Sequence, residues 1–200
     1  MLVVGLTGGI GVGKTTVARL LAGHGAIVVD CDGLGRRVVE PGGRAHEAVL
    51  AHFGDHLRTA DGTIDRPGLA AIVFNSPAAL AQLNAITHPA IDAEIAAAIK
   101  AAPADAIVVL DMAVLVESNL GEGQYDVVLV VEAPVDVRLD RLEGRGLPRD
   151  QARARMASQA TDEQRRAKGD LFVTNGGTEA ELAVAVDALW GELLQRAAAR

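Results

Sequence analysis

Residues 8–15 combine glycines, a lysine and a hydroxyl group in an order that suits the binding of phosphate groups. Their sequence, GGIGVGKT, fits the pattern G-x-x-x-x-G-K-[ST] without a gap. In that pattern the backbone N–H groups converge on the phosphates, the lysine reaches the β- and γ-phosphate oxygens, and the hydroxyl is offered to Mg²⁺. The alternative is a glycine-rich turn that binds nothing, but such a turn needs neither a lysine nor a hydroxyl residue. We therefore predict a phosphate-binding loop, or P-loop, at residues 8–15.

The segments on either side of the P-loop are predicted to aim it. Residues 2–6 are an apolar run typical of a buried strand, and residues 13–21 carry Val17, Leu20 and Leu21 at helical spacing. The positive N-terminal end of that helix would point at a bound anion. Thr15 is the predicted metal ligand. The predicted nucleotide-binding residues of this region are Gly9, Gly11, Val12, Gly13, Lys14, Thr15 and Thr16.

Four further apolar runs indicate strands, at residues 26–29, 106–110, 127–131 and 171–173. The runs are nearly continuous rather than alternating, which is typical of strands covered on both faces in a parallel sheet. Together with the first run they predict an α/β fold, a P-loop doubly wound parallel sheet of about five strands. Ligands of such sheets lie at the carboxyl ends of the strands.

The length of 200 residues predicts one domain, residues 1–200, with two elaborations. Residues 30–105 separate the second and third strands, which is far more chain than one crossover helix requires. Residues 32–104 are therefore predicted to form a helical insertion that binds the substrate, that is, the molecule that accepts the phosphoryl group. Turn signals lie at residues 41–43, 61–62 and 76–77, and one helix is predicted to give way to the next at residues 88–89.

A second elaboration is rich in arginine. Eight of the sixteen arginines lie within residues 138–166, where Gly144, Gly146 and Pro148 separate two predicted helices. Arginines three or four residues apart share a helix face, so several could be aimed at one triphosphate. We predict that residues 136–169 form a lid. For any single arginine, the alternative is a solvated surface residue paired with a nearby acid.

Carboxylates follow two of the predicted strands. Asp30 and Asp32 follow the second run, and they would point the same way if the strand persists. One could take the proton of an attacking hydroxyl or bind magnesium through water, and the other could cap a helix near Leu34. Asp32 is the predicted base because it lies farther beyond the strand. Asp111 follows the third run, where it would bind metal or substrate, or else cap the next helix.

Bulk properties exclude several classes of protein. The net charge of −7 argues against a general nucleic-acid or membrane-surface binder. The lone Cys31 excludes an internal disulfide and is typical of a reducing compartment. The first residues show neither a basic leader nor a long apolar stretch. We expect a cytoplasmic protein, a monomer or weak homo-oligomer, with no nucleic-acid or membrane partner.

The motifs, taken in order, resemble those of the dephospho-CoA kinase family. The sequence LTGGIGVGKT at residues 6–15 is followed by VDCD at 29–32 and VVEPG at 38–42. The likeness continues through IDR at 64–66, His88-Pro89, LVE at 115–117 and NGG at 175–177, and it spans nearly the whole chain. A P-loop alone is shared by many nucleotide enzymes, whereas the other elements in this order are more specific.

The resemblance implies transfer of the γ-phosphoryl group of ATP, with Mg²⁺, to the ribose 3′-hydroxyl of dephospho-CoA, the last step of coenzyme A synthesis. It implies that Asp32 is the base, and that Arg66 and His88 lie in the acceptor region. Asp111 is also expected to bind substrate. Asn175 would border the adenine, although Asn-Gly-Gly is equally a plain turn. The residues assigned to the lid are Arg141, Arg145 and Arg155, of which Arg141 and Arg145 are expected to act in catalysis with Lys14.

Some positions depart from the family pattern, and other functions compete. Cys31 stands where alanine is frequent, while Ala113 and Val116 replace a common proline and phenylalanine, which leaves the shape of the acceptor pocket open. One rival is another small-molecule kinase, acting on a nucleoside monophosphate or a sugar acid. A second rival is a regulatory NTPase, although the sequence contains no Asn-Lys-x-Asp guanine motif.

Overall fold

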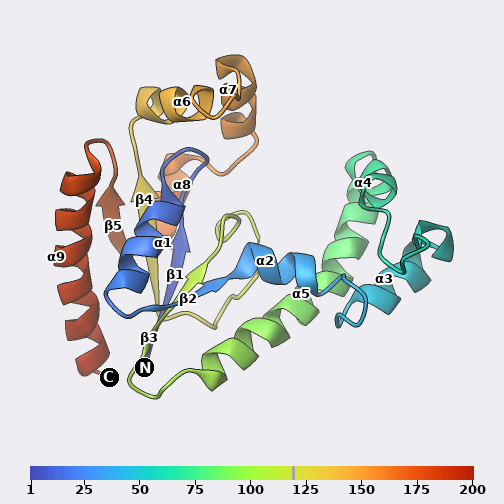
Figure 1. Cartoon of the computed structure of the whole chain (residues 1–200), viewed down its shortest axis with the longest axis horizontal. Coiled ribbons are helices and arrows are strands. Elements are labelled where there is room, and N and C mark those ends of the chain that lie inside the picture. Colours follow the sequence, from blue (N-terminus) through green and yellow to red (C-terminus); the bar gives the residue numbers. More distant parts are fainter. Residues whose placement is uncertain (119) are drawn as a thin grey trace. The chain divides into compact units, whose positions relative to one another are not determined.

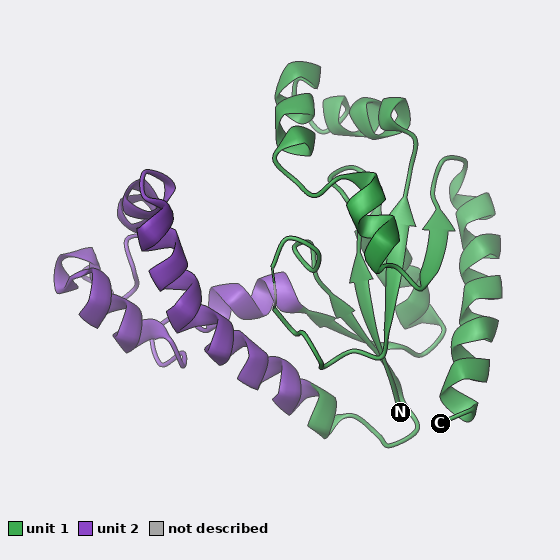
Figure 2. Cartoon of the chain, turned by 180° about the vertical axis from the view of Figure 1, so that it is seen from behind, with its two compact units in different colours: residues 1–30, 99–200 green, residues 31–98 purple. Residues whose placement is uncertain are grey.

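The computed structural model of the chain describes residues 1–118 and 120–200. The chain divides into two compact units, which Figure 2 shows in different colours. The first unit comprises Met1–Asp30 and Ile99–Arg200, and the second comprises Cys31–Ala98. The P-loop and the arginine-rich segment therefore belong to the first unit, and most of the predicted insertion forms the second.

The first unit is built on a parallel sheet, and Figure 1 shows helices packed around it. The described residues form five strands in the order β2-β3-β1-β4-β5, which confirms the predicted fold class. Each strand ends one residue later than its apolar run, because backbone pairing continues to the polar residue at the carboxyl edge. The strands are β1 (Leu2–Thr7), β2 (Ile27–Asp30), β3 (Ile107–Asp111), β4 (Val127–Glu132) and β5 (Leu171–Thr174).

The central strand β1 is the element that positions the P-loop. All six of its residues are buried, and it pairs with β3 on one side and β4 on the other. Each fully buried valine or leucine stabilises the fold by about 1.5–3 kcal/mol. The P-loop thus starts from the most thoroughly buried strand of the sheet and leads directly into α1 (Lys14–Gly23).

Helices cover both faces of this sheet. Helix α9 (Glu179–Ala198) begins at a capping box formed by Thr178 and Glu181. Its apolar stripe packs with α1 against one face, and α8 (Asp162–Lys168) contacts β4 on the other (Figures 1 and 2). No helix in residues 1–118 and 120–200 combines the length and apolar character that crossing a bilayer needs. The stripe of α9 consists of Leu182, Val186, Leu189 and Leu193.

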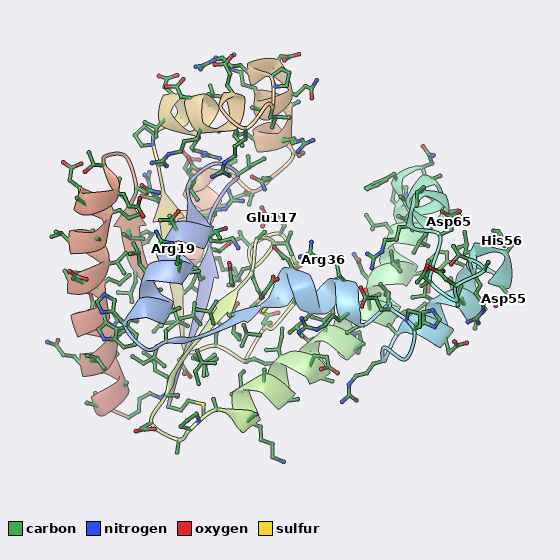
Figure 3. The ribbon with its side chains drawn as sticks, viewed as in Figure 1. Arg19, Arg36, Asp55, His56, Asp65 and Glu117 are labelled. Carbon is green, nitrogen blue, oxygen red and sulfur yellow. The ribbon has the colours of Figure 1, made fainter. Side chains whose placement is uncertain are left out.

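The second unit is helical. Asp65, labelled in Figure 3, caps α4 (Arg66–Phe74). Its carboxylate accepts a hydrogen bond from the N–H of Gly68 at 3.1 Å. The predicted turn signals at residues 41–43 and 61–62 lie between helices, and the signal at residues 76–77 marks the start of the helix that begins at Pro77. The elements of this part of the chain are α2 (Cys31–Arg37), α3 (His46–Phe53), the 3-10 helix η1 (Asp55–Leu57), α4 (Arg66–Phe74) and α5 (Pro77–Ala101).

The prediction that two helices meet at residues 88–89 is wrong. Helix α5 runs through this position, with Pro89 in its interior. An interior proline removes one backbone hydrogen bond and costs about 3 kcal/mol. Thr87, Ile91 and Ile95 are buried at four-residue spacing on one face of α5. Burial of that face offsets the cost, so the helix continues.

The region after β2 also differs from expectation. Helix α2 begins at Cys31, directly after the strand, and not near Leu34. Burial of Cys31, Gly33 and Leu34 anchors its first turns. Successive residues of a helix turn by about 100° around its axis. Asp32, in the first turn, therefore does not share the strand direction of Asp30 that the sequence predicted.

The arginine-rich segment forms three helices where two were predicted. They are α6 (Val135–Glu143), α7 (Arg149–Ala157) and α8. The third begins at a capping box in which Thr161 and Gln164 exchange hydrogen bonds with each other's backbone. The pattern Thr-x-x-Gln was present in the sequence and is the signal that predicts this helix start.

Candidate active site

The P-loop has the backbone geometry of an anion-binding turn. Gly11 and Gly13 have φ angles of +83° and +88°, which residues with side chains rarely adopt. A Cβ atom on Gly13 would also collide with the side-chain amide of Asn175. The first N–H groups of a helix have no partner inside it. Those of Lys14 and Thr15, at the start of α1, are therefore available to an anion.

The side chain of Lys14 lies at the carboxyl edge of the sheet. Its Nζ donates a hydrogen bond to Asp111 Oδ1, and the two side chains are only 14 % and 15 % exposed. Asp111 is the last residue of β3 and pairs in register with Leu6 of β1 and with Asp30 of β2. The parallel register thus brings Asp111 to Lys14, and it places Asp30 next to Asp111 at the same edge of the sheet.

Two side chains hold the carbonyl of Val12 from outside the P-loop. Asn175 Nδ2 donates to this oxygen at 2.8 Å and Arg141 Nη1 at 3.3 Å. Arg141 also donates to the backbone oxygen and the Oδ1 of Asn175, both at 3.0 Å. Asn175 follows β5 and is 6 % exposed. Its turn is therefore more than a plain connection, because its side chain fixes the P-loop.

A pocket of about 540 Å³ opens beside the P-loop. Its volume is in the range of about 300–1,000 Å³ that small-molecule sites occupy. Arg19 of α1, labelled in Figure 3, lines it. Arg19 also forms an ion pair with Glu179. The remaining cationic side chains of the lining favour an anionic occupant. The predicted site residues that the structure brings together here are Gly13, Thr16, Arg141, Arg145 and Asn175.

Other predicted site residues lie elsewhere. Arg155 is exposed on α7 and does not line this pocket. Asp32, Arg66 and His88 belong to the second unit, where Asp32 is exposed on α2 and His88 is half-buried on α5. Arg66 lines a mostly apolar pocket of about 280 Å³ within that unit.

Two residues that contact the P-loop carried no sequence signal for that role. Gln159 Oε1 accepts a hydrogen bond from the N–H of Ile10 at 2.8 Å. Arg138 was grouped with arginines aimed at a triphosphate, yet it is 4 % exposed and its Nε donates to the carbonyl of Ile10 at 2.9 Å. Burial lowers the pKa of the Arg138 guanidinium, and the nearby carboxylate of Asp162 opposes that effect. Both contacts join residues far apart in the chain.

Comparisons with known proteins point to one family. The family model described as dephospho-CoA kinase matches residues 2–181. The dephospho-CoA kinase of Frankia casuarinae is 53 % identical over 196 residues, covering 98 % of this chain and 85 % of the relative. That of Thermobifida fusca is 49 % identical and covers 98 % of each chain. The solved dephospho-CoA kinase from Campylobacter jejuni shares the fold, with a TM-score of 0.73, 23 % identity, and coverage of 96 % and 97 %.

Proposed function

The chain belongs to the dephospho-CoA kinase family, and from that premise we propose how its residues carry out the reaction. It is an ATP-dependent phosphotransferase that transfers the γ-phosphoryl group of ATP to the ribose 3′-hydroxyl of dephospho-CoA. The observation that carries the proposal is the P-loop with Lys14 at the carboxyl edge of the sheet, beside a pocket lined by Arg141 and Arg145. This arrangement suits a nucleoside triphosphate.

In this proposal the P-loop binds the triphosphate. The backbone N–H groups of Gly11 and Gly13 and the ammonium of Lys14 contact its oxygens, and the base and ribose occupy the adjoining pocket with Thr16 and Asn175. The hydroxyl of Thr15 suits Mg²⁺, which prefers oxygen ligands and takes most of them from phosphates and water. When bound, the ion supplies charge neutralisation at the β- and γ-phosphates.

Phosphoryl transfer depends on alignment and on stabilisation of charge. Lys14, Arg141 and Arg145 stabilise the oxygens of the migrating group. Asp32 orients the 3′-hydroxyl and takes its proton as the new O–P bond forms and the bond between the β- and γ-phosphates breaks, which releases ADP. Two residues of chain span at most about 7 Å, so Asp32 stays close to Asp30 at the end of β2.

The remaining assignments concern the acceptor and the setting. We assign residues 32–104 to acceptor binding, with Arg66, His88 and Asp111 as substrate ligands, and residues 136–169 to a lid that includes Arg155. A closed lid would keep water away from the γ-phosphate. We also propose that the protein works in the cytoplasm as a monomer or weak homo-oligomer, with neither nucleic acid nor membrane as a partner.

Acceptor choice tests the proposed reaction. The purified protein is supplied with Mg²⁺ and γ-labelled ATP, and dephospho-CoA is compared with AMP, with shikimate and with no acceptor. We expect label to transfer to dephospho-CoA at least about 100-fold faster than to the other acceptors or to water, since only the correct acceptor is aligned with the γ-phosphate. Faster transfer to AMP or shikimate would identify a different kinase, and hydrolysis alone would indicate an NTPase.

Asn175→Ala is expected to weaken nucleotide binding. The substitution removes a buried hydrogen bond to Val12 and leaves Arg141 with one acceptor fewer, a loss of about 1.5 kcal/mol or about 10-fold in the KM for Mg·ATP. The KM for dephospho-CoA should stay within about twofold of the wild-type value. Asn75→Ala, which removes a surface hydrogen bond of the second unit, is the matched control. Equal KM values for the two variants would contradict the role given to Asn175.

A further inference from the structure

Ile10, at the bend of the P-loop, is held by side chains at both polar ends of its backbone. Its N–H donates to Gln159 at 2.8 Å, and its carbonyl accepts from Arg138 Nε at 2.9 Å. Arg138 comes from α6, and Gln159 lies between α7 and α8. All of these residues belong to the first unit. The arginine-rich segment therefore forms direct hydrogen bonds to the backbone of the P-loop.

Arg138 is itself fixed in place. Its Nη1 lies 3.2 and 3.3 Å from the two carboxylate oxygens of Asp162, the first residue of α8. Its guanidinium also lies against the P-loop, because a Cβ atom on Gly9 would come within 2.5 Å of Arg138 Nη2. Arg138 is only 4 % exposed and, unlike Arg141, does not line the pocket beside the P-loop, so its guanidinium is placed to hold the P-loop backbone and not a phosphate.

Arg138 and Arg141 hold alternate carbonyls of the P-loop. They lie three residues apart on α6, and they donate to Ile10 and Val12 respectively. In a trans peptide unit the C=O and the following N–H point in opposite directions. The hydrogen bond from Arg138 fixes the carbonyl of Ile10, so the N–H of Gly11 points in the opposite direction. The hydrogen bond from Arg141 to the carbonyl of Val12 orients the N–H of Gly13 in the same manner.

We propose that Arg138 and Gln159 are positioning residues, which hold the P-loop in the shape that binds Mg·ATP without touching the nucleotide themselves. This inference rests on the proposed function, since it assumes that the P-loop binds Mg·ATP. It separates Arg138 from Arg141 and Arg145, which line the nucleotide pocket. It also gives Gln159 a defined role, which is to accept a hydrogen bond from the N–H of Ile10.

Two pairs of variants distinguish a positioning role of Arg138 and Gln159 from a purely electrostatic one. Gln159→Glu keeps the acceptor oxygen, whereas Gln159→Met has a similar size without it. Arg138→Lys keeps the positive charge but cannot bridge a carbonyl and a carboxylate with a planar fork. Arg196→Lys, on α9 outside the arginine-rich segment, is the matched control, because Arg196 forms a surface ion pair with Glu192. Circular dichroism and thermal unfolding identify folded variants, and the Gln159 pair tests the proposal even if Arg138→Lys fails to fold.

The readout is the Kd for Mg·ATP measured by calorimetry, together with the KM values for both substrates. We expect Gln159→Met and Arg138→Lys to raise the Kd and the KM for Mg·ATP about 10-fold, with the KM for dephospho-CoA within twofold. Gln159→Glu should recover most of the loss, and Arg196→Lys should match the wild type.

Unchanged Mg·ATP affinity in Gln159→Met would overturn the proposal, as would an equal loss in Gln159→Glu and Gln159→Met. Direct binding keeps this test apart from the proposed reaction. Wild-type protein that binds Mg·ATP but does not phosphorylate dephospho-CoA would contradict the reaction, and the variants would still decide whether Arg138 and Gln159 position the P-loop.

Discussion

Lys14→Ala is expected to lower kcat/KM about 10²–10³-fold while the protein remains folded. The ammonium of Lys14 is assigned to the β- and γ-phosphates, and loss of one preorganised charge at a transition state typically costs about 3–4 kcal/mol. Thermal stability should fall slightly, because Asp111 loses the partner with which it is mostly buried. Steady-state kinetics and thermal unfolding measure the two effects.

Lys100→Ala is the control for this substitution, since Lys100 is exposed near the end of α5. It should leave both activity and stability near the wild-type values. A Lys14→Ala protein with kcat/KM within tenfold of wild type would remove the P-loop lysine from the mechanism.

Asp32→Asn is expected to reduce kcat about 10²–10⁴-fold, with little change in the KM for either substrate. Asparagine keeps the size and much of the hydrogen bonding of the carboxylate but cannot accept the proton of the 3′-hydroxyl. The measurement is kcat and both KM values in the steady state, for the wild type and the variant.

Asp30→Asn is the informative comparison, because Asp30 lies two residues away at the end of β2. If Asp32 is the base, Asp30→Asn retains the greater part of the turnover. A greater loss in Asp30→Asn, together with near-normal turnover of Asp32→Asn, would assign the base to Asp30 instead.

The strands and the P-loop could be predicted because their signals are contiguous in the sequence. Residues 2–6 form a complete apolar run and residues 8–15 a complete motif, and the strands of the sheet each correspond to one such run. Asp111 was placed correctly at the end of a strand for the same reason. Its hydrogen bond with Lys14 depends on the order of strands, which a run of apolar residues does not specify.

The predictions that failed depended on competition between local preference and burial. Pro89 favours a helix boundary locally, but the buried face of α5 prevails. Cys31 starts a helix because its neighbours are buried, which no periodicity in residues 31–37 indicates.

The side-chain hydrogen bonds that hold the P-loop backbone could not be predicted from the sequence. Arg138 and Gln159 reach Ile10 across 128 and 149 residues of chain, and Asn175 reaches Val12 across 163. Neither composition nor spacing distinguishes Arg138 from the other arginines of its segment. Burial and hydrogen-bond geometry do, because they show which carbonyl each guanidinium meets.

A single-turnover experiment is the most direct test that the γ-phosphoryl group of ATP passes to the 3′-hydroxyl of dephospho-CoA. Excess protein is mixed with Mg²⁺, one equivalent of γ-labelled ATP and dephospho-CoA, and the products are identified by mass and by ³¹P resonance. We expect the label to appear on the ribose 3′-oxygen, giving coenzyme A and ADP. Label recovered as inorganic phosphate, or left in ATP, would contradict it.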